Sequence, residues 1–204
     1  MSLEEFGALL LFATAMSFTP GPNTTLSTAL AANFGLRRAV GFIVAVPTGW
    51  TLMMVASGLG LGALVLALPA LRVGVKALGI AYLVWLAWKL AGSSRLGEAD
   101  RERLNVGFWQ GVALQFVNIK AWMLALSLAA GWVTSAAGQP ATNPGQRLAI
   151  VCAVMLVFAL SSNLTYAVVG AVLREWLVHG RRLLWFNRAM AALLLATAVW
   201  MVGA

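Results

Sequence analysis

The sequence predicts an all-α membrane protein whose six transmembrane helices form two inverted three-helix repeats, with the first span broken at a Pro-Gly-Pro motif. Of the 204 residues, 61% are hydrophobic and 10% are charged, and the mean hydropathy is +0.88. This composition is typical of a polytopic helical membrane protein. The basic residues gather in short links between apolar runs, and the two halves of the chain share short patterns. One transmembrane domain is therefore expected over residues 1–204.

The first span is expected at about residues 4–35, and a polar motif interrupts it. The motif reads Thr19-Pro20-Gly21-Pro22-Asn23. The apolar run before it is shorter than the roughly 20 residues that cross a bilayer, so the motif lies within one crossing. Two prolines remove backbone donors and end the regular helix. The carbonyl groups freed in this way must face protein or a watery cavity rather than lipid.

A second half-helix is expected to begin at Pro22, with Gly21 or Asn23 as its N-terminal cap. The positive end of that half-helix then points into a cavity and favours an anion. The alternative is a structural helix with a proline kink. The clustering of Pro, Gly and Asn favours a substrate site.

The other spans follow from the apolar runs and the turn residues between them. They are expected at about residues 39–67, 72–91, 107–134, 147–173 and 184–203. Residues 92–106 form the one sizeable polar loop between them. This division gives a first repeat at about 1–91 and a second at about 107–204.

Basic residues predict the orientation of these spans. Ten Lys and Arg residues lie on the side of the links after spans one, three and five, and three lie on the opposite side. The ten are Arg37, Arg38, Lys89, Arg95, Arg101, Arg103, Arg174, Arg181, Arg182 and Arg188, and the three are Arg72, Lys76 and Arg147. This asymmetry places both termini outside and the polar loop in the cytoplasm. The net charge of +8 is thus a topology signal and does not indicate nucleic-acid binding.

Short matches between the halves predict the repeat. Gly35-Leu36-Arg37-Arg38-Ala39 resembles Gly145-Gln146-Arg147-Leu148-Ala149, and each stretch precedes the second span of its half. Because each repeat has an odd number of spans, the second must be inverted relative to the first. Inverted repeats are typical of secondary transporters, which bind substrate near the midplane between the repeats.

Span four carries its own polar interruption, formed by Gln115, Asn118 and Lys120. An ammonium group in mid-membrane costs about 2.5–3.5 kcal/mol, so Lys120 is expected to face the interior and to have a partner. The alternative is a lysine that reaches the cytoplasmic interface. Lys120 lies about 20 Å along the helix from Gly107, which favours the interior position.

Other polar residues offer little chemistry. Asn163 in span five either lines the cavity or joins helices. The single cysteine, Cys152, excludes a disulfide framework and a thiolate metal site, and the single histidine, His179, lies in a basic turn. No metal and no cofactor are expected. A membrane-embedded enzyme is disfavoured because the spans lack an acid–base pair.

The motifs of the chain resemble those of the LysE/RhtB-type amino-acid exporter family, over essentially its whole length. They are Thr19-Pro20-Gly21-Pro22-Asn23, Gly35-Leu36-Arg37, Gly79-Ile80-Ala81-Tyr82-Leu83, Gly107-Phe108 with Gly111, and Asn118-Ile119-Lys120-Ala121-Trp122. The resemblance implies efflux of amino acids or related metabolites from the bacterial cytoplasm across the inner membrane, driven by ion gradients. Family members usually have Asn-Pro-Lys in span four. Because Ile119 replaces that proline, a milder break is expected there.

The predicted function is secondary active export of neutral amino acids by alternating access. The predicted substrate-binding residues are Thr19, Pro20, Gly21, Pro22, Asn23, Gln115, Asn118, Lys120 and Asn163. The half-helix after Pro22 and Lys120 are expected to hold the substrate carboxylate, and the amides to supply neutral hydrogen bonds. A small channel or scaffold, or an exporter of basic amino acids, is the alternative. The proton is a candidate coupling ion, and a homodimer is left open.

Overall fold

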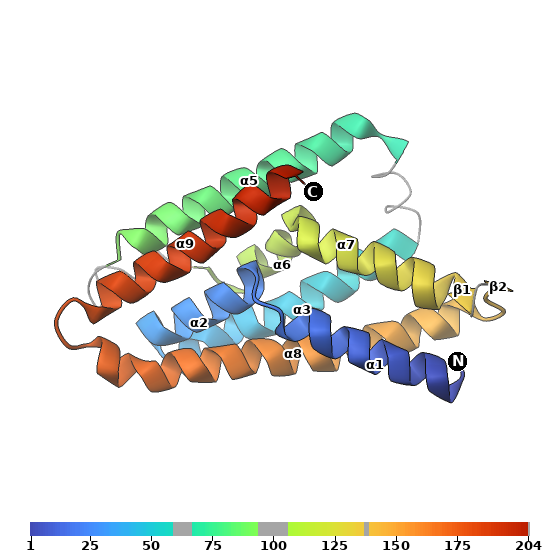
Figure 1. Cartoon of the computed structure of the whole chain (residues 1–204), viewed down its shortest axis with the longest axis horizontal. Coiled ribbons are helices and arrows are strands. Elements are labelled where there is room, and N and C mark those ends of the chain that lie inside the picture. The colour runs from blue at the N-terminus through green and yellow to red at the C-terminus, as the bar shows by residue number, and fades with distance from the viewer. Residues whose placement is uncertain (59–66, 94–105, 137–138, 204) are drawn as a thin grey trace.

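The computed structural model describes residues 1–58, 67–93, 106–136 and 139–203 and has an all-α architecture (Figure 1). Its elements are α1 (Leu3–Phe18), α2 (Pro22–Phe34), α3 (Leu36–Gly58), α5 (Pro69–Ala91), α6 (Phe108–Val117), α7 (Ile119–Leu128), the π-helical turn η2 (Ala129–Val133), β1 (Ser135–Ala136), β2 (Gln139–Pro140), α8 (Pro144–Leu177) and α9 (Arg182–Gly203). The two short strands form an antiparallel pair. Most of the expected polar loop and the end of the expected second span lie outside the described residues.

Four described helices are long and apolar enough to cross a membrane, namely α3, α5, α8 and α9. The bent pair α6 and α7–η2 gives a fifth crossing if it counts as one span. Helices α1 and α2 have 16 and 13 residues, so each alone is shorter than the about 20 residues of a full crossing. An all-α membrane protein is thus confirmed, and the count of six spans stays a prediction.

The break between α1 and α2 lies where the Pro-Gly-Pro motif predicts it. Helix α1 ends at Phe18, and Pro22 occupies the first turn of α2. Gly21, one of the two residues predicted as caps, is the N-terminal cap of α2. The Thr24 hydroxyl donates to the Gly21 carbonyl at 3.1 Å and accepts from the Gly21 N–H at 3.0 Å. The side chain of Thr24 therefore fixes both backbone groups of the cap.

The prediction of a milder break at Ile119 is wrong. Helices α6 and α7 are bent by 68°. Asn118 has extended backbone, ends α6 and caps α7, and its Oδ1 accepts from the Lys120 N–H at 3.1 Å. A proline is not needed, because the first N–H groups of a helix have no intrahelical partner and an asparagine cap stabilises the new start.

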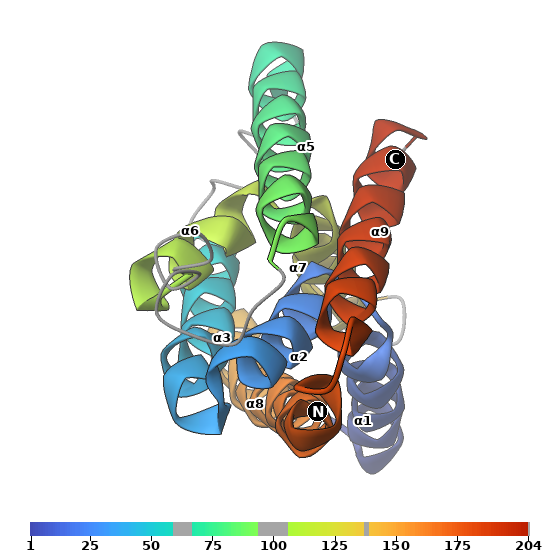
Figure 2. The same ribbon diagram turned by 90° about the vertical axis from the view of Figure 1, so that its left-hand side faces the viewer.

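The helices pack around two apolar cores. Helix α2 lies along α8, while α3 packs against both α6 and α8. Helices α5 and α9 pack on each other, and they diverge from the rest of the bundle toward the start of α5 and the end of α9 (Figures 1 and 2). One apolar core joins α2, α3, α5 and α9, and a second joins α1, α3, α7 and α8. Helix α3 thus belongs to both cores and runs past the breaks.

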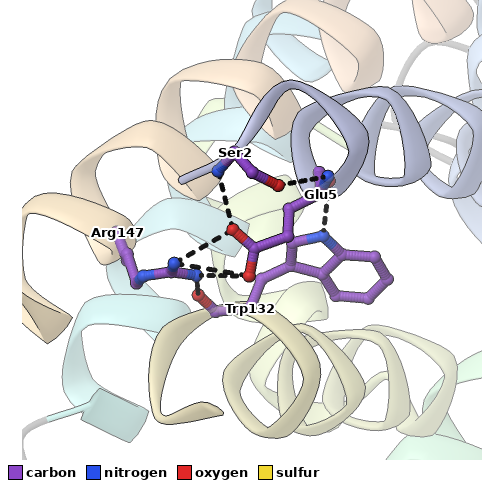
Figure 3. Close-up of polar contacts among 4 residues, drawn as sticks. All are labelled: Ser2, Glu5, Trp132 and Arg147. Atoms are coloured by element: carbon purple, nitrogen blue, oxygen red, sulfur yellow. Dashed lines mark hydrogen bonds and ion pairs between the residues drawn. The ribbon is translucent and has the colours of Figure 1, made fainter. Parts of the chain in front are cut away.

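A polar cluster joins the ends of α1, η2 and α8 (Figure 3). Glu5 forms a capping box with Ser2 and accepts from both terminal nitrogens of Arg147, with the closest contact at 3.1 Å. Arg147 also donates to the Trp132 carbonyl, and the Trp132 indole donates to the Glu5 carbonyl. The sequence predicts Arg147 only as a topology signal. The structure shows that it also ties the second half of the chain to the N-terminus.

Gly79 in α5 allows a close approach to the break in the second half. A Cβ atom at this position would lie 2.0 Å from the Val117 carbonyl oxygen, at the end of α6. At Gly74, about one and a half turns earlier in α5, an added Cβ atom would have no neighbouring atom within 4 Å. Packing therefore requires a glycine at position 79 and not at position 74.

We predict that Gly79→Ala lowers the free energy of unfolding by about 1–3 kcal/mol or more, because overpacking forces backbone shifts. The matched change Gly74→Ala should be neutral or stabilise by up to about 1 kcal/mol, since alanine is the better helix former. Thermal unfolding of both variants in detergent measures the difference. Equal stability of the two variants would contradict the contact.

Candidate functional site

The break leaves consecutive carbonyl groups at the end of α1 without helical partners, and two side chains of α8 bind the first of them. Ser162 Oγ donates to the Ser17 carbonyl at 2.6 Å, and the Tyr166 hydroxyl donates to the Phe18 carbonyl at 2.9 Å. Ser162 is fully buried. Because a buried carbonyl without a partner costs about 1–3 kcal/mol, these contacts stabilise the end of α1 at the break.

Lys120 of α7 binds the next two carbonyls. Its Nζ donates to the Thr19 carbonyl at 2.9 Å and approaches the Pro20 carbonyl at 3.5 Å. The C-terminal end of a helix carries partial negative charge, so a cation is stabilised there. A Cβ at Gly21 would lie 3.3 Å from both Cδ and Nζ of Lys120, so glycine gives the lysine room. The ammonium group thus lies at the broken backbone that follows the end of α1.

Asn23 and Gln115 join the start of α2 to α6. Asn23 Nδ2 donates to Gln115 Oε1 at 2.9 Å, and Gln115 Nε2 donates to Asn23 Oδ1 at 3.1 Å. Gln115 is fully buried and also donates to the Gly111 carbonyl. Each half-helix start therefore bonds to the other half of the chain, α2 through Asn23 and α7 through Lys120.

Asn163 joins α8 to α2 in the same layer. Ser27 Oγ donates to Asn163 Oδ1 at 2.8 Å, and Asn163 Nδ2 donates to the Ala159 carbonyl of its own helix at 2.8 Å. The sequence predicts Asn163 but misses Ser27. Serine occurs widely as a spacer between apolar helices, so nothing in its local pattern distinguishes it.

A cavity of about 60 Å³ lies between the two breaks. One water needs about 10–15 Å³ on this measure, so the cavity has room for several waters or part of a small polar solute. The predicted residues that line it are Thr19, Gly21, Pro22, Asn23, Gln115, Asn118, Lys120 and Asn163. Its apolar wall includes Met16, Trp50, Leu124 and Met155. The structure therefore brings eight of the nine predicted residues to one space.

The ninth, Pro20, lines a second and larger hollow of about 430 Å³. This hollow lies between the break, α7 and α9, where α9 diverges from the bundle (Figure 1). Met16, Thr19, Gly21 and Lys120 line both spaces, so the broken backbone and the lysine form the partition between them. Among the described residues that line either space, Lys120 is the one charged side chain.

The arrangement offers one cation, two helix starts and several neutral amides and hydroxyls around a small space. These groups suit a solute with a carboxylate and with its own hydrogen-bond donors. Within the described residues, no group of three His, Cys, Asp or Glu side chains is placed to hold a metal ion.

Comparisons with known proteins point to one family. The family model described as "LysE type translocator" matches residues 14–203. The cysteine/O-acetylserine efflux protein of Klebsiella pneumoniae is 29% identical over 204 residues, which cover 99% of each chain. The protein of the same name from Salmonella choleraesuis is 30% identical over 185 residues, or 90% of each chain. That of Escherichia coli O139:H28 is 28% identical over 90% of each chain. No solved structure matches this chain.

We predict that Ser162→Ala lowers the free energy of unfolding by about 1–3 kcal/mol, because it leaves the Ser17 carbonyl without its donor. The neighbouring change Ser161→Ala is the matched control, since Ser161 is exposed and donates within its own helix. Thermal melts of the two purified variants compare them directly. If the Ser162→Ala protein is as stable as the control, the hydrogen bond from Ser162 to the Ser17 carbonyl does not contribute to the free energy of unfolding.

Proposed function

The chain belongs to the LysE-type translocator family, as its motifs predict, and on this premise we propose that it is a secondary active exporter of neutral amino acids and related small metabolites. As an amino-acid exporter of this family with several apolar helices, it is an integral protein of the inner membrane. The proposed mechanism is alternating access between two inverted repeats. The proposed orientation has both termini on the periplasmic side, from the ten-to-three distribution of basic residues.

One observation carries the proposal, namely that two broken helices from opposite halves of the chain meet at one small cavity. The first halves of the two broken spans are α1 and α6, and the second halves are α2 and α7. Helices α3 and α8, and likewise α5 and α9, are counterparts in the proposed repeats and pack on each other. Discontinuous helices at a repeat interface are the sites where secondary transporters bind substrates and ions.

The substrate carboxylate is proposed to lie at the start of α2 and near Lys120. An ammonium group has three N–H donors, and the Thr19 and Pro20 carbonyls take at most two of them. One donor is then left for the carboxylate. The amide oxygens of Asn23 and Gln115 are proposed to receive the substrate ammonium. Because these two amides bond to each other in this structure, the substrate has to replace that pair.

Charge favours neutral side chains. No described residue that lines either cavity carries a carboxylate, and the one charged group is the Lys120 ammonium. A basic amino acid would bring a second cation into this space without a partner, which is strongly unfavourable. Export of basic amino acids is therefore the weaker alternative. For coupling, Lys120 is the proposed site of proton exchange; the homodimer stays a further possibility for the assembly.

We predict that neutral amino acids, such as cysteine and O-acetylserine, compete with a labelled neutral amino acid in proteoliposomes, and that lysine and arginine do not. The names of the relatives motivate the choice of these two neutral compounds. A pH gradient across the vesicle should raise the rate if protons drive export. Stronger competition by lysine than by the neutral compounds would overturn the substrate class. Transport that neither saturates nor responds to a gradient would favour a channel.

We also predict that Lys120→Ala and Asn23→Ala abolish this transport while the protein stays folded in the membrane. Lys120→Arg should fail as well, because a planar guanidinium replaces a compact charge. Lys89→Ala is the matched control, since Lys89 stacks on Trp85 away from both cavities. The assay is uptake into vesicles at equal protein content. Full activity in Lys120→Ala would limit this lysine to a structural role.

A further inference from the structure

Trp50 lines the small cavity and carries a buried hydrogen-bond donor without a partner among the described residues. The residue is 4% exposed and lines that cavity. Its Nε1 is buried and has no hydrogen-bond partner among the residues that the structure describes. Buried polar groups in folded proteins are almost always paired, so an exception requires an explanation. Tryptophan donates and cannot accept, so the missing partner is an acceptor.

Two other indoles in the second core show what the fold does elsewhere. The Trp122 Nε1 donates to the Phe116 carbonyl at 2.8 Å, and the Trp132 Nε1 donates to the Glu5 carbonyl at 3.0 Å. Trp50, which packs in the same core, differs from them because it lines the cavity. The Ser17 hydroxyl is a second buried group without a partner in the described part of the chain, and it lines the same space.

The position of Trp50 along α3 indicates which part of a solute it meets. Val46 lies one turn earlier, lines the same cavity and packs in the core around α2. Trp50 lies about 6 Å further along the helix. There it packs in the second core, whose members Leu124 and Met155 form the apolar wall of the cavity. The indole N–H is therefore a donor beside the apolar wall of the cavity.

We propose that Trp50 Nε1, assisted by the Ser17 hydroxyl, binds a hydrogen-bond acceptor in the side chain of the exported amino acid. The inference rests on the proposed function and deepens it, because it names the substrate class. The polar end of the cavity holds the charged groups of the amino acid, and its side chain extends toward Trp50. Neutral side chains that carry an acceptor oxygen, such as an ester carbonyl, are then preferred over aliphatic side chains of the same shape. An aliphatic side chain leaves the indole donor unpaired.

The test uses two solutes of the same shape. O-acetylserine carries an ester, and 2-amino-5-methylhexanoate replaces its two oxygens by a methylene and a methyl group. For the full-length protein in proteoliposomes, the acceptor-bearing solute is expected to compete about 10- to 100-fold better, since the site leaves a buried donor unpaired with the other. Equal competition by both would overturn the role of Trp50 while leaving the exporter proposal intact. Competition by neither would overturn the exporter proposal itself.

Trp50→Phe then removes the donor and keeps an aromatic ring. It should bring the ratio between the two solutes close to one by weakening O-acetylserine alone. A loss of the same size for both solutes would show that the indole contacts a group they share, such as the carboxylate, and would overturn the assignment to the side chain. An unchanged ratio would overturn it as well.

Trp122→Phe is the matched control, because its indole is bonded within the protein and does not line the cavity. It should leave the ratio unchanged and lower the melting temperature, since it removes a hydrogen bond. Trp50→Phe should lower the melting temperature less than Trp122→Phe, because both variants lose the volume of the larger ring and only Trp122→Phe also loses a hydrogen bond to the protein. A drop for Trp50→Phe larger than that for Trp122→Phe would contradict the proposal.

Discussion

The structure depends on one constraint, which is that the free carbonyl groups of a broken helix must be satisfied by protein where the break is buried. The carbonyls from Ser17 to Pro20 have no helical partner, and three side chains from α7 and α8 supply the donors. Those helices must therefore pack against the end of α1 at a fixed depth. The second half of the chain is thus held at the break by hydrogen bonds as well as by apolar contact. Lipid offers no such donors, so the break has to lie inside the protein.

The same constraint brings charge to the interior. A neutral donor would satisfy one carbonyl, whereas the Lys120 ammonium reaches two and also counters the partial negative charge at the end of α1. Burying this cation is expensive without a partner, and the helix end is that partner. The lysine is therefore a structural element of the break and, in the proposed exporter, also the group that attracts a carboxylate. Both roles follow from the position of Lys120 in the first turn of α7.

Local chemistry was predictable from the sequence, and long-range pairing was not. The Pro-Gly-Pro motif fixes the break and its cap through backbone effects that act over a few residues, and the polar residues of span four stand out in an apolar run. The break at Asn118 is sharper than predicted, because the chain bends by 68° at an asparagine cap that has no proline beside it. The partners Ser27–Asn163 and Glu5–Arg147 are 136 and 142 residues apart. No local pattern joins such pairs, and an unpaired indole such as that of Trp50 becomes visible only once its surroundings are known.

The proposed alternating-access exporter must return without its substrate, and the hydrogen bonds of this site suit that requirement. In this structure, Asn23 pairs with Gln115, Ser27 pairs with Asn163, and Lys120 binds the end of α1. Each of these polar groups therefore has a protein partner, whereas an unpaired buried group would cost about 1–3 kcal/mol. A solute gains affinity only by the difference between its own contacts and those it replaces. Moderate binding, which allows release on the far side, follows from this exchange. Groups that have no partner to exchange contribute more fully to affinity, and selectivity is expected to concentrate on them.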